Sequence, residues 1–241
     1  MKTLSLLILF FISFSSVPSP LPDFPFVTVT GKSAIKVKPN TANLNFYVFV
    51  FDKNSESAKL SLDKTSLDVI ELFTTFGVNP KKITLSEINK RTIRNRNNNY
   101  EALEVIGYEF TQHFAVAMDN LNNFSEIYSA LLAINNIEEL NSQFDISNRE
   151  TVETELIKKA AESAKLKAIQ MAAGLGVKID SVFAFNDSGS FPSFFATFGL
   201  NEKALRAVAM QSPRASQSSG LFVPQFIEVS KTVNVVYKIE K

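Results

Sequence analysis

Apolar and polar residues alternate over much of this chain with the period of two that a half-buried β-strand shows. The alternating stretches are separated by turn signals such as Pro39–Asn40 or by stretches with helical spacing. The strands predicted in this way are 27–37, 41–51, 82–93, 102–118, 138–146, 177–186 and 227–239. The third and fourth of these strands are joined by a polar run, which predicts a hairpin.

The stretch 41–51 is apolar on both faces at one end. Its first face carries Ala42, Leu44, Phe46, Val48 and Val50. The opposite face begins with asparagines and then becomes aromatic at Tyr47, Phe49 and Phe51. A strand of this kind is normally covered on both sides. We therefore expect a helix, a loop or another subunit to cover the aromatic side.

Helical spacing of apolar residues predicts two helices before residue 140. Asn54 or Ser55 is expected to cap the first helix, which Gly77 should end. Asp119 or Asn120 is expected to cap the second, and Asn135 follows its last apolar position. Both helices have one apolar stripe, so each should pack on a sheet.

A third, longer helix is predicted from Ser147 to Gly174. Ser147 and Glu150 have the spacing of a capping box, and Gly174 is expected to end the helix in a left-handed conformation. The predicted buried stripe is Val152, Leu156, Ala160, Ala164, Ala168, Met171 and Leu175. Because this stripe is rich in alanine, we expect the helix to lie close against a sheet.

The order of these elements is roughly ββαββαβαβ(β), closing with 227–239, whether or not the late insertion contains an edge strand. Hairpins that alternate with helical crossovers predict an α+β domain. Its sheet should be mixed and largely antiparallel, with about three packed helices.

The first 22 residues have the order of a secretory signal peptide: Lys2, an apolar run of about eleven residues, then small residues and prolines. Cleavage after Ser15, Ser16 or Ser19 fits equally well. The apolar run is too short for a membrane anchor, which needs about 18 or more apolar residues. We therefore expect a periplasmic or secreted protein, with one domain over 23–241 and no transmembrane helix once the signal is removed.

The chain has 25 basic residues, 24 acidic residues and no cysteine. Loss of Lys2 with the signal leaves 24 of each, so the processed protein should be close to neutral and has no charge preference for nucleic acid. Without cysteine, neither disulfides nor thiol peroxidase chemistry is available. Packing alone must hold the fold together.

Residues 187–224 form a predicted low-complexity insertion rich in Ser, Ala, Gly, Gln and Pro. A loop of this length is usually either functional or disordered. It contains the phenylalanines Phe191, Phe194, Phe195 and Phe198, which either form a contact surface or fold back on their own domain.

Candidate catalytic residues are few. His113 is the only histidine and lies on the more polar face of its strand, so we interpret it as an ordinary strand residue. Lys90, Arg91, Arg94 and Arg96 form a basic cluster that we interpret as a solvated hairpin end. Ser188 after Asp187 has no identifiable base. We expect no catalytic site, no cofactor and no metal.

Several stretches taken together resemble the SIMPL domain family, which includes a periplasmic immunogenic protein and a stress-associated periplasmic protein of bacteria. They are VTVTGKSAIKVKPNTANLNFYV, FGVNPKKITLSEI, IGYEFTQHFAVAMDNLNNFSEIYSALL, KKAAESAKLKAIQMAAGLGVKIDSVFAFNDSG and FIEVSKTVNVVYKIE. The resemblance covers about Phe24 to Glu240.

This resemblance implies an exported α+β protein without an established enzymatic activity, which in some members forms large ring-like or channel-like homo-oligomers. It also implies an association with oxidative stress, which must be indirect here. Our first hypothesis is a non-enzymatic protein of the periplasm or cell envelope that forms homo-oligomers and contacts envelope partners. The alternative is a small-molecule or peptide binding module that uses the phenylalanines of the insertion. An enzyme is the third and weakest hypothesis.

Overall fold

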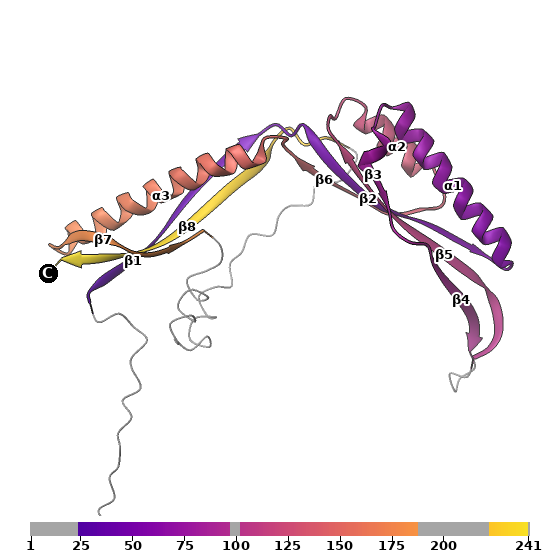
Figure 1. Ribbon diagram of the computed structural model, residues 1–241, viewed down its shortest axis with the longest axis horizontal. Coiled ribbons are helices and arrows are strands. Elements are labelled where there is room, and N and C mark those ends of the chain that lie inside the picture. The colour runs from indigo at the N-terminus through magenta and orange to yellow at the C-terminus, as the bar shows by residue number, and fades with distance from the viewer. Residues whose placement is uncertain (1–23, 97–101, 188–221, 241) are drawn as a thin grey trace, which may run out of the picture. The chain divides into compact units, whose positions relative to one another are not determined.

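The computed structural model describes residues 24–96, 102–187 and 222–240, which form three α-helices and eight strands (Figure 1). The elements are β1 (Phe26–Val37), β2 (Thr41–Asp52), α1 (Ser55–Thr75), the 3₁₀ helix η1 (Pro80–Lys82), β3 (Ile83–Leu85), β4 (Asn89–Arg96), β5 (Ala102–Met118), α2 (Phe124–Leu132), β6 (Ile137–Asp145), α3 (Arg149–Gly174), β7 (Lys178–Asn186) and β8 (Ile227–Glu240). The predicted α+β class and the order of elements are confirmed. The insertion phenylalanines and the predicted signal peptide lie outside the described residues.

The described residues fall into two compact units. The larger contains residues 33–159 and 222–231, and the smaller contains 24–32, 160–187 and 232–240. β1, α3 and β8 contribute to both units. The single domain expected over 23–241 remains a prediction.

A five-stranded sheet, with strand order β3-β5-β2-β6 and β4 also paired to β5, forms the larger unit. The neighbouring strands of this sheet run antiparallel. α1 and α2 lie on one face of this sheet (Figure 1). The predicted inward face of β2 is buried, and Phe46 at its centre stacks at 5.2 Å on Phe114 of β5 and at 6.2 Å on Phe73 of α1.

Both ends of α1 follow the sequence prediction. The Asn54 side-chain oxygen accepts hydrogen bonds from the backbone N–H groups of Glu56 (2.8 Å) and Ser57 (3.1 Å). At the other end Gly77 has a φ of +81°, and the N–H of Val78 donates to the carbonyl of Phe73 at 2.9 Å. This is a Schellman ending, which favours glycine because its left-handed φ crowds a side chain.

The single strand predicted over 82–93 is divided into η1, β3 and β4. At the break, hydrogen bonds from Ser86 take the place of regular strand pairing with β5. Its N–H donates to the carbonyl of His113, and its hydroxyl accepts from the N–H of His113, both at 3.0 Å. The side chain of Gln112 donates to the Ser86 carbonyl at 3.0 Å. The Ser86 hydroxyl accepts the hydrogen bond that a backbone carbonyl would accept in a regular strand. Hydrophobic periodicity does not report such a bond, so the break was not predicted.

The predicted start of α2 was wrong by several residues. The helix begins at Phe124 with Asn123 as its N-cap residue, which makes no side-chain capping bond. Asn120 instead accepts a hydrogen bond from the N–H of Asn122 at 3.3 Å, and Asp119 pairs with Lys82 at 3.2 Å. The expected cap residues are therefore used in the turn before the helix.

The predicted capping box at the start of α3 was also wrong. α3 begins at Arg149, because Ser147 is held by the turn between β1 and β2. Asn40 donates from its side chain to the Ser147 hydroxyl at 3.0 Å, and its side-chain oxygen accepts from the Ser147 N–H at 2.8 Å. A contact over 107 residues thus decides where the helix starts.

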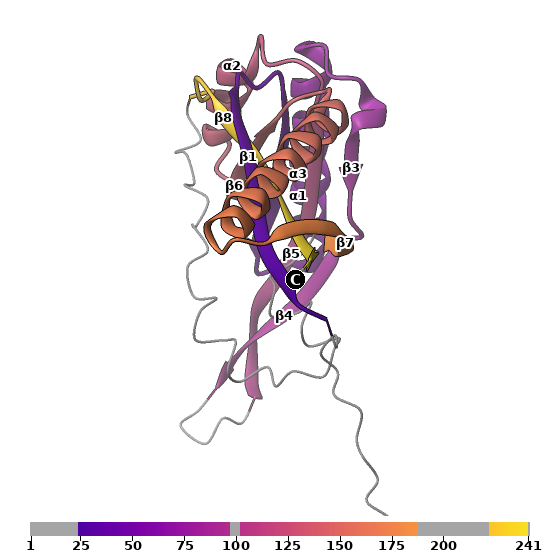
Figure 2. The same cartoon turned by 90° about the vertical axis from the view of Figure 1, so that its left-hand side faces the viewer.

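The smaller unit has a three-stranded sheet of order β1-β8-β7, with α3 along one face (Figure 2). Pro25 accepts a backbone hydrogen bond from Ile239, and the Thr30 hydroxyl donates to Asn234, so β1 and β8 run antiparallel. Asn234 also donates to Asn186 at 3.0 Å. This row of polar side chains links all three strands.

α3 contacts the sheet through a row of residues spaced by four. The buried residues are Leu156, Ala160, Ala164, Ala168 and Ala172. Met171 and Leu175, which were predicted to be buried, are 49% and 76% exposed. Because buried residues recur every four positions and a helical turn has 3.6 residues, the buried row winds slowly around the helix. At the C-terminal end the row therefore includes Ala172 and not Met171 or Leu175.

Gly31 of β1 lies directly beneath this alanine row. A Cβ atom at position 31 would lie 1.8 Å from the carbonyl oxygen of Ala160 and 2.6 Å from the backbone nitrogen of Ala164. Both neighbours are backbone atoms of a helix, so neither can move aside alone. The close contact between helix and sheet therefore requires glycine here.

Gly176, and not the predicted Gly174, ends α3. Gly176 has a φ of +70°, and the N–H of Val177 donates to the carbonyl of Ala172 at 2.9 Å. Gly174 belongs to the helix itself. Gly174 and Gly176 are separated by one residue, and either glycine suits a helix end.

A chain of charged side chains joins β6, α3 and β8. Arg149 contacts Asp145 at 2.7 Å and Glu153 at 3.0 Å, and Lys231 contacts Glu153 at 2.7 Å. This accounts for Lys231, a lysine on an otherwise apolar strand face. The hydrogen bond from Lys231, followed by that from Arg149, lowers the pKa of Glu153 below its ordinary 4.5.

Replacement of Gly31 by alanine should destabilise the protein by about 1–3 kcal/mol, because the methyl group overlaps helix backbone. Gly174→Ala is the matched control, since a Cβ there meets nothing within 4 Å. The control should be neutral or stabilising by up to about 1 kcal/mol. Urea unfolding followed by circular dichroism measures both, and equal midpoints would contradict the close contact.

The stabilisation that Glu153 contributes should be lost in acid. Its pKa is lowered in the folded state, so the contribution is complete above pH 4.5 and disappears as the pH falls through the lowered value. Wild type should melt above Glu153→Gln at pH 7, and the difference should shrink between pH 5 and 3. Glu162→Gln, an exposed carboxylate of the same helix, serves as control. A difference in melting temperature that stays constant with pH would exclude this role.

Candidate interaction surface

The aromatic side of β2 lies on the face of the five-stranded sheet opposite α1 and α2. Tyr47 is 37% exposed, Phe51 is 44% exposed, and Phe49 between them is half-buried. α1 and α2 lie on one face of the sheet (Figure 1), and Phe46 points to that face because it stacks on Phe73 of α1. The expected cover on the aromatic side is thus supplied by neither α1 nor α2.

Strand register sets the neighbours of these aromatic residues. We call the surface they share the open face, and define it as Asn43, Asn45, Tyr47, Phe49, Phe51, Thr111, His113, Asn141 and Gln143. Across β2 and β5 the pairs are Asn43 with Ala117, Asn45 with Ala115, Tyr47 with His113, and Phe49 with Thr111. Across β2 and β6, Asn43 pairs with Gln143 and Asn45 with Asn141. One end of the open face therefore carries amides and the other carries aromatic rings.

Phe51 lies over Gly107 of β5. A Cβ atom at Gly107 would come within 2.6 Å of the Phe51 ring and 2.7 Å of the Asp52 carbonyl. The glycine thus leaves room for the ring to cover the strand. This contact depends on the register between β2 and β5, so the pattern of either strand alone does not predict it.

Among the described residues, charged groups adjoin the open face on β4, β5 and β6. Glu109, opposite Phe51, pairs with Arg91 of β4 at 3.5 Å. Glu138 of β6 lies opposite Tyr47. The face itself contains no lysine or arginine, so it suits a neutral partner better than a phosphate-rich one.

His113 contacts Tyr47, with ring centroids 5.0 Å apart and an angle of 50° between the planes. Within the described residues no group of three or more His, Asp or Glu side chains is arranged to hold a metal ion. Its other neighbours on this face are Thr111, Ala115 and Ser86, whose hydroxyl accepts from the backbone N–H of His113 and donates to the Glu87 carbonyl.

Of the basic cluster singled out in the sequence, Arg91 borders this face through its pair with Glu109. Lys90 lies over the rings of Tyr108 and Phe110, at 4.9 and 5.5 Å, on the helix side of the sheet. Asp187 follows β7 in the smaller unit. Ser188 and the phenylalanines of the insertion lie outside the described residues.

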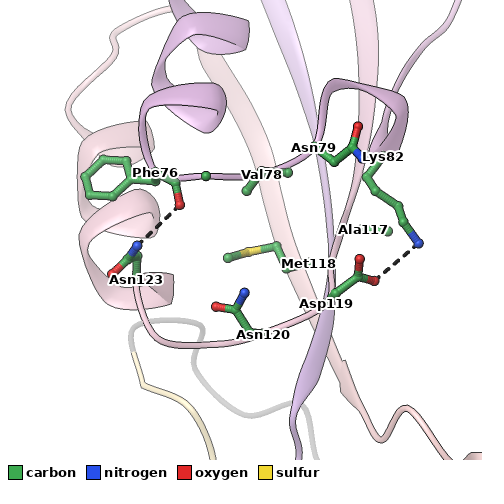
Figure 3. Close-up of a pocket in the computed structure, with 10 residues that line it drawn as sticks. Phe76, Val78, Asn79, Lys82, Ala117, Met118, Asp119, Asn120 and Asn123 are labelled. Carbon is green, nitrogen blue, oxygen red and sulfur yellow. Dashed lines mark hydrogen bonds and ion pairs between the residues drawn. The ribbon is translucent and has the colours of Figure 1, made fainter.

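A small pocket lies between the end of α1 and the start of α2 (Figure 3). Its volume is about 90 Å³. Asn123 donates to the carbonyl of Phe76 at 3.3 Å, and Lys82 pairs with Asp119 at 3.2 Å at its rim. Small-molecule sites usually occupy about 300–1,000 Å³, whereas this space corresponds to about three water molecules. It is not a site for a substrate of ordinary size.

Sequence reasoning missed two features. Ser66 of α1 is buried and donates to the side chain of Gln112 at 3.1 Å, so a polar contact fixes α1 on β5. The signal was a glutamine within an apolar strand face. The smaller unit also exposes large apolar side chains on α3 and β7, among them Leu166, Val182 and Phe185.

A family model described as SIMPL, a protein of unknown function (DUF541), matches residues 27–237. The chain belongs to the SIMPL family. The match runs from β1 to β8, and so includes both compact units and the open face. No curated protein matches the chain at a significant level. None of the helices in the described parts of this SIMPL protein is long and apolar enough to cross a membrane.

Two phenylalanines of β2 provide a test of which face is the core. Phe46→Ala should cost about 3–5 kcal/mol, because Phe46 is fully buried among Phe73 and Phe114. Phe51→Ala should cost less, about 1–2 kcal/mol, since Phe51 is 44% exposed and only part of its ring packs on the strand. Chemical denaturation at a protein concentration low enough to keep the chain monomeric measures both. A similar loss for both variants would mean that the open face is covered within one chain.

Proposed function

We propose that this SIMPL protein is an exported, non-enzymatic protein of the periplasm or cell envelope that forms homo-oligomers through the open face. The observation that carries the proposal is the exposure of Tyr47 and Phe51 on a sheet face that neither α1 nor α2 covers. Exposed aromatic residues gathered on one surface commonly mark a protein contact.

A second copy of the chain suits this face chemically. An amide side chain has both donors and an acceptor, so Asn43, Asn45 and Gln143 are complementary to the same residues of another copy. Aromatic rings also pack favourably on one another. The face has no cluster of like charges to oppose such pairing, and the processed chain is predicted to be neutral.

Export is supported by the composition of the first 22 residues. The role in stress defence that the resemblance implies must then act through contacts with envelope components, because the chain has no thiol to react with an oxidant. The lack of a base–nucleophile arrangement around His113 supports the non-enzymatic part of the proposal.

Light scattering on the full chain, purified after expression with its own N-terminus, tests the proposal between about 1 and 100 μM. We expect a mass above that of the monomer, which the double variant Tyr47→Lys/Phe51→Lys should reduce. The two lysines would remove both rings from the contact, and their charges, together with those of Glu138 and Glu109 opposite them, would have to lose their water on assembly. A monomer over the whole concentration range would refute self-association.

Leu60→Lys/Leu67→Lys is the matched control. Both leucines are highly exposed on α1, and the variant adds the same two charges. It should keep the mass of the wild type. An equal loss of mass in both double variants would show that added charge, and not the open face, controls assembly.

A further inference from the structure

His113 lies near the middle of the open face. It is the only histidine of the chain, it is half-buried, and its ring contacts Tyr47 at 5.0 Å. On its own strand the neighbours on this face are Thr111 and Ala115. A second copy packed on the open face would therefore cover the imidazole together with the tyrosine.

The charged groups around His113 come from each adjacent element. Glu109 lies four residues away on β5, about 14 Å along the strand, and pairs with Arg91 of β4. Glu138 of β6 lies beyond Tyr47, so β2 separates it from the imidazole. Glu87 follows Ser86 in the connection between β3 and β4 and is exposed. Across the described residues, none of these carboxylates forms an ion pair with His113.

A protonated imidazole on this face would keep its water as long as the face is open. Covering it with aromatic and amide side chains removes that water and supplies no counter-charge, which disfavours the charged form. The neutral imidazole has no such penalty and adds apolar contact area. Assembly and protonation of His113 therefore oppose each other.

We propose that His113 makes self-association through the open face dependent on pH: the contact forms when the imidazole is neutral and is released when it takes up a proton. This regulation rests on the proposed function, because it requires the open face to be the assembly contact. Histidine is the side chain that ordinarily changes charge between pH 5 and 8, and the chain has neither a second histidine nor a cysteine. The switch is thus confined to one residue.

Sedimentation velocity or light scattering of the full chain at pH 7.5 and 5.5 tests the proposal. We expect the dissociation constant to rise at least about tenfold at pH 5.5. At that pH an ordinary histidine is mostly protonated, and each His113 must lose its proton before the contact forms. In His113→Gln the ratio of the two constants should be close to one, whatever its value at pH 7.5. In His113→Lys assembly should be weak at both pH values.

Far-UV circular dichroism at pH 5.5 checks that the fold is retained. A pH dependence that persists in His113→Gln, assembly that does not change with pH, or assembly that strengthens in acid would each overturn the switch. The last result would mean that a carboxylate of the second copy reaches His113. A monomer at pH 7.5 would instead refute the proposed function itself, so the two failures are distinguishable.

Discussion

The alternation of side chains along β2 is the constraint on which the larger unit depends. One strand supplies the centre of the core through Phe46 and the centre of the open face through Tyr47. Because side chains alternate strictly, a shift of one residue in register would exchange the two sets. The stacking of Phe46 between Phe73 and Phe114 opposes such a shift, and thereby keeps the aromatic side chains of the open face in place.

The smaller unit depends on a different constraint, the short distance between the backbones of α3 and β1. Alanines spaced by four bring the backbone of α3 so near β1 that only glycine fits at position 31. Lys167 donates to the Thr30 carbonyl at 2.9 Å and so occupies a hydrogen-bonding group at the edge of the sheet. A lysine at this place also hinders the addition of a further strand to β1. The sheet edge and the helix contact are thus stabilised by one short stretch of α3.

Much of the fold could be predicted from sequence because most strands are amphipathic over their full length. The helix ends were less predictable. Ser147 and Gly174 satisfy the local rules for a cap and a stop, but Asn40 binds Ser147, and Gly176 takes the left-handed position. The buried row of α3 was wrong at Met171 and Leu175, because a helical pattern does not give the angle at which the helix crosses a sheet.

The same distinction holds for the candidate surface. Tyr47, Phe49 and Phe51 follow from a pattern within one strand, whereas the contacts of Tyr47 with His113 and of Phe51 with Gly107 require the register of strands about 60 residues apart. That register gives the open face a direction, with amides at one end and rings at the other. A second copy that placed amides on rings would leave buried donors unpaired, which is costly. Like-on-like pairing avoids this cost, and it places Tyr47 and His113 of both copies near the middle of the contact, where a proton on the imidazole has the largest effect.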